Sequence, residues 1–166
     1  MKPRFLLFLV ILASPALAQA PKSLDLFVQG QGGYRAYRIP ALVVTPKGAV
    51  LAFCEGRKNG RGDSGDIDLI VRRSDDGGKS LGDPQVVWDD GGNTCGNPCP
   101  VVDRQTGTIW LLMTHNPGSA KEPELSAGRA GGPARTVWVT HSEDDGRTWA
   151  RPTDITASAK KPEWTW

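Results

Sequence analysis

A short segment occurs twice in the chain and restricts its fold more than any other feature. The pattern is Ser-x-Asp-x-Gly-x-Ser/Thr followed by a bulky apolar residue, and it runs from Ser74 to Leu81 and again from Ser142 to Trp149. In each copy the Asp can accept hydrogen bonds from nearby backbone N–H groups, and the Gly can adopt a conformation closed to other residues. The sequence therefore predicts two hairpin turns of one kind, which mark a repeated β unit and not an active site.

The runs of residues around these turns predict an all-β chain with two such units. Alternating or β-branched stretches separated by turn residues are typical of antiparallel strands. The first unit is expected to contain strands at 41–45, 49–54, 67–73 and 85–88, with a Pro-Lys-Gly turn at 46–48. The second is expected to contain strands at 100–102, 108–115 and 136–141, with a turn at 104–107.

The spacing of the two turns indicates an insertion in the second unit. Ser142 follows Ser74 by 68 positions, which is longer than the roughly 40–50 residues of a plain propeller blade. Residues 116–135 are rich in Gly, Pro, Ala and Glu and show no hydrophobic period. We expect this stretch to form a long loop inserted into the second unit.

Two arginines and an acid stand at the ends of the predicted strands of the first unit. Arg38 lies in Tyr-Arg-Ile-Pro, Arg57 in Glu-Gly-Arg, and Asp63 in the Gly-rich loop that follows. A guanidinium group is always charged and can meet a carboxylate with two parallel N–H donors, so a pocket for an acidic ligand is a natural use. An acid that can donate a proton beside such a pocket indicates chemistry, although Arg and Asp on loops are usually only solvated.

These motifs together resemble one family. The repeated turns resemble the Asp-box of sialidases, Tyr-Arg-Ile-Pro resembles the segment with the first arginine of their arginine triad, and residues 55–69 resemble the loop that carries their acid/base aspartate. With residues 96–103, the resemblance covers nearly all of the chain after its first twenty-odd residues. It implies a six-bladed β-propeller of which residues 19–166 form the amino-terminal part, about the first two blades. The first box ends in Leu81, where the family usually shows Trp.

The number of blades predicts that the chain is a fragment. Propellers need on the order of four to eight four-stranded sheets to close, and this length supplies a little over two. A complete small all-β domain is the alternative, and it would leave Trp164 and Trp166 at a frayed end.

The resemblance implies an exo-acting glycoside hydrolase that releases terminal sialic acid with retention. Arg38 would hold the sugar carboxylate, Arg57 would line the pocket, and Asp63 would be the acid/base. Its rivals are Asp66, in the same loop, and Asp68, which opens the next predicted strand and reads as a structural group. Sialidases use a Tyr nucleophile, which would lie later in a full-length chain, because Tyr34 and Tyr37 are in the wrong place to serve. The alternative is a non-catalytic Asp-box propeller that binds sugars or proteins.

The first 18 residues read as an export signal. Lys2 and Arg4 precede an apolar run over 5–12, and small residues at 16–18 predict cleavage after Ala18; a buried first helix is disfavoured by Pro15. We expect a secreted or periplasmic protein whose partners are sialylated glycoproteins, glycolipids or oligosaccharides. The remaining chain has 18 basic and 18 acidic residues, so nucleic-acid binding is not indicated, and no second apolar stretch would span a membrane.

The three cysteines cannot all pair with one another. Cys95 and Cys99 enclose a tight loop that only a suitable turn would allow to be bridged, whereas Cys54 lies in an apolar run and reads as a buried small side chain. The spacing of Cys and His is poor for a metal site, and neither a metal nor another cofactor is expected.

Overall fold

The computed structural model describes residues 23–126, 132–161 and 163–164, so the predicted signal segment lies outside the described residues. Within them the regular secondary structure is nearly all β, as the sequence predicts. The elements are β1 (Ala36–Val44), β2 (Val50–Arg57), β3 (Ile67–Ser74), β4 (Gln85–Trp88), β5 (Thr94–Val102), β6 (Ile109–Asn116), α1 (Glu122–Ser126), β7 (Thr136–Ser142), β8 (Thr153–Asp154) and α2 (Thr156–Ala159).

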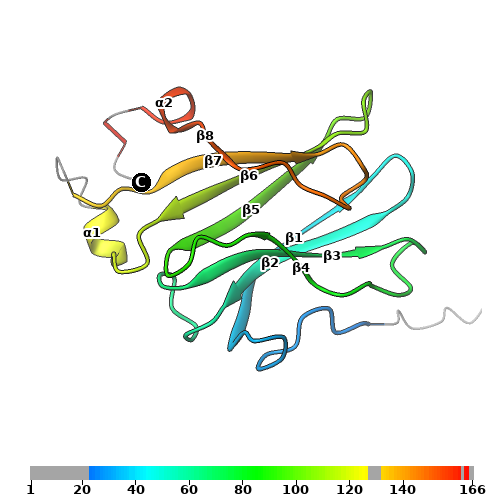
Figure 1. Ribbon diagram of the computed structural model, residues 1–166, viewed down its shortest axis with the longest axis horizontal. Helices are drawn as coiled ribbons and strands as arrows, with labels where there is room; N and C mark the ends of the chain where they lie inside the picture. Colours follow the sequence, from blue (N-terminus) through cyan, green and yellow to red (C-terminus); the bar gives the residue numbers. More distant parts are fainter. Residues whose placement is uncertain (1–22, 127–131, 162, 165–166) are drawn as a thin grey trace, which may run out of the picture.

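The strands form two antiparallel four-stranded units. In the first unit β1, β2, β3 and β4 pair in chain order, and in the second β5, β6, β7 and β8 do the same. One parallel pairing, Ile67 with Thr94, joins the units between β3 and β5. Figure 1 shows the two sets of strands side by side as an open assembly with no closure into a ring.

The two units repeat each other in register. Val50 lies opposite Ser74 in the first unit, and Ile109 lies opposite Ser142 in the second. The first strand of each unit also contains an irregularity, between Arg38 and Ala41 in β1 and between Gly96 and Cys99 in β5. Each irregularity contains a non-glycine residue with positive φ followed by Pro, Ile39 (φ 54°) and Asn97 (φ 52°). The backbone plan of one blade is therefore used twice.

Both Asp-boxes adopt the predicted turn. Asp76 accepts hydrogen bonds from the backbone N–H groups of Lys79 and Ser80 at 2.9 Å, and its other oxygen accepts from Ser80 Oγ at 2.6 Å. In the second box Asp144 accepts from the N–H groups of residues 147 and 148 at 2.9 and 2.8 Å and from the Thr148 hydroxyl. These local bonds stabilise both turns in the same way.

The second box also holds the two units together. Trp149 packs edge-on against Phe53 of β2 at 5.6 Å between ring centroids, so it joins the core that both units share. Arg73 of β3 donates from Nε to the backbone oxygen of Asp145 at 2.7 Å. A Cβ at Gly146 would lie 2.1 Å from Leu51 Cδ2, so only glycine allows this close approach.

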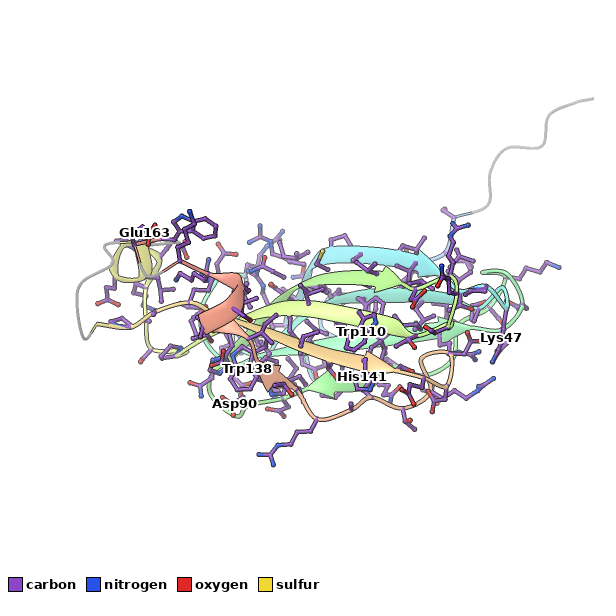
Figure 2. All side chains as sticks on the ribbon, turned by 90° about the horizontal axis from the view of Figure 1, so that it is seen from above. Lys47, Asp90, Trp110, Trp138, His141 and Glu163 are labelled. Carbon is purple, nitrogen blue, oxygen red and sulfur yellow. The ribbon has the colours of Figure 1, made fainter. Side chains whose placement is uncertain are left out.

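The main core lies between the facing sheets. Its fully buried members come from both units: Ala49, Leu51, Phe53, Leu69, Val71, Cys95, Ile109, Leu111 and Met113. On the opposite face of the first sheet, Cys54 and Ile70 form a smaller buried cluster with Tyr34, whereas the opposite face of the second sheet has exposed apolar residues. On the second unit Val101 and Trp110 are 52% and 41% exposed, and Figure 2 shows Trp110 beside His141 of the neighbouring strand.

Several sequence expectations were wrong in detail. The first strand of the second unit begins at Thr94, six residues before the expected start, because the Gly-Asn-Pro irregularity interrupts its alternation. The expected loop at 116–135 contains the short helix α1, and β8 was not expected at all. Within the part of the chain described here, no helix has the length and apolar character needed to cross a membrane.

Candidate functional site

The irregularity in β1 places Arg38 next to the loop acid. Ile39 in a left-handed conformation shifts the register after Arg38, whose side chain is 42% exposed. Arg38 Nη1 lies 2.7 Å from Asp63 Oδ1, and Arg57 Nη1 lies 2.8 Å from the same oxygen. The structure thus brings together all three residues that the sequence selected, with the carboxylate of Asp63 between two guanidinium groups.

Arg57 differs from Arg38 in being buried. Its side chain is 3% exposed, and Nη1 donates to the backbone oxygens of Arg61 and Gly62, each at 2.7 Å. Those residues immediately precede Asp63. Arg57 therefore holds the loop in place from within while it also borders the open cavity described below.

Glu55 is the buried partner of Arg57. Its Oε2 accepts from Arg57 Nε at 2.9 Å and from Nη2 at 2.5 Å, and its Oε1 accepts the backbone N–H of Asn97 at 2.9 Å. Residues at i and i+2 of a strand share a face, which is why Glu55 and Arg57 can pair within β2. Glu55 was not predicted as a site residue, although an acid two positions before an arginine in an apolar strand is a recognisable signal.

The two rivals of Asp63 lie on the other side of the loop, around Lys58. Lys58 Nζ is 3.0 Å from Asp66 Oδ1, 3.0 Å from Asp68 Oδ2 and 3.3 Å from Asp89 Oδ2. Burial opposes the charge of the ammonium group, but its bonds to these carboxylates outweigh that effect and raise the pKa of Lys58. The three carboxylates lie within 4.8 Å of one another, and the lysine already supplies a cation at their centre.

Asp68 is part of the scaffold of this loop. Its side chain is 2% exposed, and Oδ2 accepts from the Tyr34 hydroxyl at 2.7 Å. Burial raises the pKa of Asp68, and burial together with the bond to Asp68 raises that of Tyr34. Asp66 is 26% exposed, whereas Asp63 is 63% exposed, so of the three acids Asp63 is the most accessible to a ligand.

An open cavity of about 270 Å³ begins at this point and extends toward the second unit. Asp63, Arg57 and Glu55 border it from the first unit. The inserted segment supplies an opposite wall, where Arg135 Nη2 lies 3.0 Å from Glu122 Oε2 of α1 and Arg135 Nε donates to Asn116 at 3.3 Å. These residues were not predicted, because the inserted segment reads in sequence as a plain loop and their meeting depends on the fold.

The cysteines are all free in the structure. Cys54 and Cys95 are buried and Cys99 is exposed, so the possible bridge between Cys95 and Cys99 is not formed. Burial raises the pKa of Cys54 to about 12 and raises that of Cys95 as well. Buried thiols of this kind are poor nucleophiles, and the prediction for Cys54 as a small buried side chain is confirmed.

The fold and the site together define a class. Two four-stranded antiparallel units, each closed by an Asp-box, form an open part of a β-propeller with a cluster of charged residues at the end of the first unit. The model of the BNR repeat-like domain matches residues 47–165. The chain belongs to this family.

Its relatives are sialidases. The chain is 33% identical over 152 residues to an exo-alpha-sialidase of Aspergillus fumigatus, covering 81% of this chain and 37% of that protein. It is 35% identical over 149 residues to a sialidase of Micromonospora viridifaciens, covering 84% and 22%. The chain thus spans between about a fifth and two fifths of the length of these relatives.

Solved structures agree on the fold. The Hadza microbial sialidase Hz136 matches with a TM-score of 0.71 and 31% identity, covering 80% of this chain and 28% of that one. A leech intramolecular trans-sialidase matches with a TM-score of 0.67 at 12% identity, covering 84% and 38%. These neighbours confirm the prediction of an all-β, partial propeller of the sialidase type.

Proposed function

We propose that this chain is the part of an exo-acting sialidase that binds the sugar carboxylate and supplies the acid/base. The observation that carries the proposal is the position of Asp63, an accessible carboxylate within 2.7 and 2.8 Å of two guanidinium groups at the edge of a cavity. A turn that only stabilises a propeller has no need of this arrangement. The similarity to sialidases over most of the chain supports the same substrate class.

The proposed roles follow from exposure and charge. Arg38 is the accessible guanidinium group, so it would bind the carboxylate of sialic acid, which can take the place that Asp63 holds in the free protein. Asp63 would protonate the leaving oxygen and then activate water. Arg57, which is almost fully buried, would shape the pocket mainly by holding the loop.

The remaining catalytic groups would come from outside this chain. A sugar with a carboxylate at its anomeric carbon repels a carboxylate nucleophile, and sialidases use Tyr instead. Tyr34 is buried against Asp68 and Tyr37 donates to the backbone of Gln31. Neither tyrosine is placed to act as the nucleophile. Retaining hydrolysis is therefore proposed for a longer protein and not for residues 19–166 alone. Catalytic groups that act as a unit lose nearly all activity when part is missing.

The partners and the location of the protein remain part of the proposal. Sialylated glycoproteins, glycolipids or oligosaccharides are the expected substrates, and the apolar start of the sequence favours export to the periplasm or the outside of the cell. A non-catalytic propeller that binds sugars or proteins is the competing function. The two differ in whether Asp63 transfers a proton.

A leaving-group comparison tests the role of Asp63. In the complete protein, Asp63→Ala should slow release of a sugar from sialyllactose by roughly 10²–10⁴-fold, because that oxygen needs a proton. Release of an activated phenol should fall much less. Asp66→Ala is the matched control, since it removes an acid of the same loop. Equal loss on both substrates for Asp63→Ala, or a larger selective loss for Asp66→Ala, would contradict the assignment.

A further inference from the structure

Glu55 occupies a position from which it can control the loop acid through Arg57. It is a buried carboxylate, with its side chain 4% exposed. It lies at the meeting point of β2 and β5, and its contacts run to both units of the fold. Its place at the border of the cavity does not by itself indicate a role for Glu55 in hydrolysis.

The contacts of Glu55 form a continuous path to Asp63. The backbone N–H of Asn97 binds Oε1, the Arg57 fork binds Oε2, and Arg57 Nη1 then binds the carbonyl groups of Arg61 and Gly62. The same Nη1 lies 2.8 Å from Asp63 Oδ1. Every link before Asp63 is buried or partly buried, and a low local dielectric strengthens such charged hydrogen bonds.

The second unit is shaped to receive this carboxylate. A Cβ at Gly96 would lie 2.4 Å from Glu55 Oε1, so the glycine makes the space that Glu55 fills. Asn97 has φ of 52°, and in this conformation its N–H donates to Glu55 and not to a strand partner. Both features belong to the irregularity of β5, whereas the acid loop belongs to the first unit.

We propose that Glu55 is a positioning residue for hydrolysis: through Arg57 it fixes the loop that carries Asp63 and offsets the arginine charge that Asp63 experiences. The proposal rests on the function proposed above. Without the Glu55 charge, Asp63 would face two guanidinium groups, those of Arg38 at 2.7 Å and Arg57 at 2.8 Å, with no buried carboxylate to offset them. Without the Glu55 fork, the guanidinium group would be free to turn away from the carbonyl groups of the loop.

Glu55→Gln in the complete protein tests both parts. Gln keeps the volume, but its single acceptor oxygen cannot serve both the Arg57 fork and the Asn97 N–H. We expect kcat for sialyllactose to fall roughly a hundredfold, the loss typical of a displacement of about 1 Å at a reacting group. We expect a much smaller loss for an activated phenyl sialoside, and the high-pH limb of the kcat profile should move to lower pH.

Three further variants make the result specific. Glu143→Gln is the matched control, because Glu143 is 79% exposed on the second box. It should change neither kcat for either substrate nor the pH profile. Glu55→Asp keeps the charge and should keep the high-pH limb near that of the wild type. Gly96→Ala should displace Glu55 without removing its charge. It should therefore slow sialyllactose hydrolysis more than hydrolysis of the phenyl sialoside, while the high-pH limb of the kcat profile moves little.

Limited proteolysis gives a readout that does not depend on turnover. Arg61 is exposed in the held loop, and trypsin should cut after it faster in Glu55→Gln than in the wild type or in Glu143→Gln. Equal losses on both substrates, with an unmoved pH profile and unchanged cleavage at Arg61, would overturn the positioning role. If Glu55→Gln does not fold, Gly96→Ala takes its place. Equal losses of kcat on the two substrates in Gly96→Ala would then overturn the positioning role.

The outcomes also separate this proposal from the proposed function. A wild-type protein that releases sialic acid from neither substrate would overturn the function itself, and the role of Glu55 with it. An active wild type whose Glu55→Gln variant shows no contrast between substrates would overturn only the positioning role.

Discussion

The two units share one backbone plan but differ in the charges that they place on it. When the units are aligned through the residues opposite Ser74 and Ser142, Arg38 corresponds to Gly96, Glu55 to Thr114 and Arg57 to Asn116. The second unit forms the same strands, the same irregularity and the same box with these uncharged residues. The charged cluster of the first unit is therefore not required by the fold, which is the main physical argument that it serves a ligand.

The same alignment relates a covered face to an open one. Leu51 and Phe53 of the first unit, which are buried against the second unit, correspond to Trp110 and Leu112 of the second. Trp110 is 41% exposed and lies on the face turned away from the first unit (Figure 2). The second unit thus presents to its surroundings the face with which the first unit makes the core.

Arg38 and Arg57 both lack a charged counterpart in the second unit, and removing Arg38, the exposed one, should have the largest effect. In the complete protein, Arg38→Ala should cost roughly 2–5 kcal/mol of transition-state binding, the range for truncating one member of a charge pair with its ligand. Arg38→Lys should rescue poorly, because Lys lacks the planar fork. The measurement is kcat/KM on a sialoside.

Arg104→Ala is the matched control for that prediction, because Arg104 is an exposed arginine in a turn of the second unit. It should leave kcat/KM unchanged. Wild-type kcat/KM in Arg38→Ala, or an equal loss in Arg104→Ala, would contradict the claim that the charges of the first unit, and not those of the second, bind the substrate.

The apolar residues that end the two boxes should differ in their contribution to stability. Trp149 packs against Phe53 across the boundary of the units, so Trp149→Ala should lower the free energy of unfolding by about 3 kcal/mol, as for a large aromatic side chain at a core. Leu81 is only half-buried and joins no core cluster among the described residues. Leu81→Ala should cost less than about 1 kcal/mol. Denaturation of both variants by urea checks the contrast, and equal costs would contradict it.

The open face of the second unit should bind hydrophobic probes when the chain is produced alone. Residues 19–166 should bind an apolar dye and melt without a sharp transition, because exposed apolar faces are interaction or aggregation sites. Trp110→Ser should lower the dye signal more than Leu24→Ser, which changes an exposed apolar residue (51%) away from this face. A sharp melt with no dye binding would show that the face needs no partner.

Acid should weaken the second box in a narrow pH range. Burial opposes the charge of Asp144, but hydrogen bonds from Thr148, Ser142 and Arg147 outweigh it and lower its pKa to about 2. Because the folded pKa lies below the unfolded value of about 3.9, the contribution of Asp144 is present above that value and is lost as pH falls toward 2.

Asp144→Asn tests this effect. At neutral pH it should cost about 1 kcal/mol after allowance for solvent screening, and the cost should vanish near pH 2. Asp83→Asn, at an exposed position, is the control and should show no such difference. A cost for Asp144→Asn that does not change between pH 7 and 2 would contradict the assignment.

Local signals explain which parts of the fold could be predicted from sequence. The boxes could be predicted because Ser, Asp and Gly bond within eight residues, and β4 was placed correctly because its run is bounded by turn residues. The start of β5 could not be predicted, because Asn97 and Pro98 interrupt the alternation that marks a strand. The two residues of β8 form a strand only by pairing with β7.

The site divides in the same way. Arg38, Arg57 and Asp63 lie in motifs, so they could be proposed as site residues from the sequence. Glu55 was missed because its significance depends on Asn97, 42 positions later in the chain. Arg135 and Glu122 of the insertion were missed because that segment has no period, and only the fold brings them to the cavity.

A structure of the complete protein with sialic acid bound tests the central claim most directly, namely that the charges of the first unit form the sugar site. We predict that the sugar carboxylate will lie within hydrogen-bond distance of the Arg38 guanidinium group, with the anomeric oxygen facing Asp63. Binding at the corresponding end of the second unit, with no contact between the sugar carboxylate and Arg38, would contradict the account.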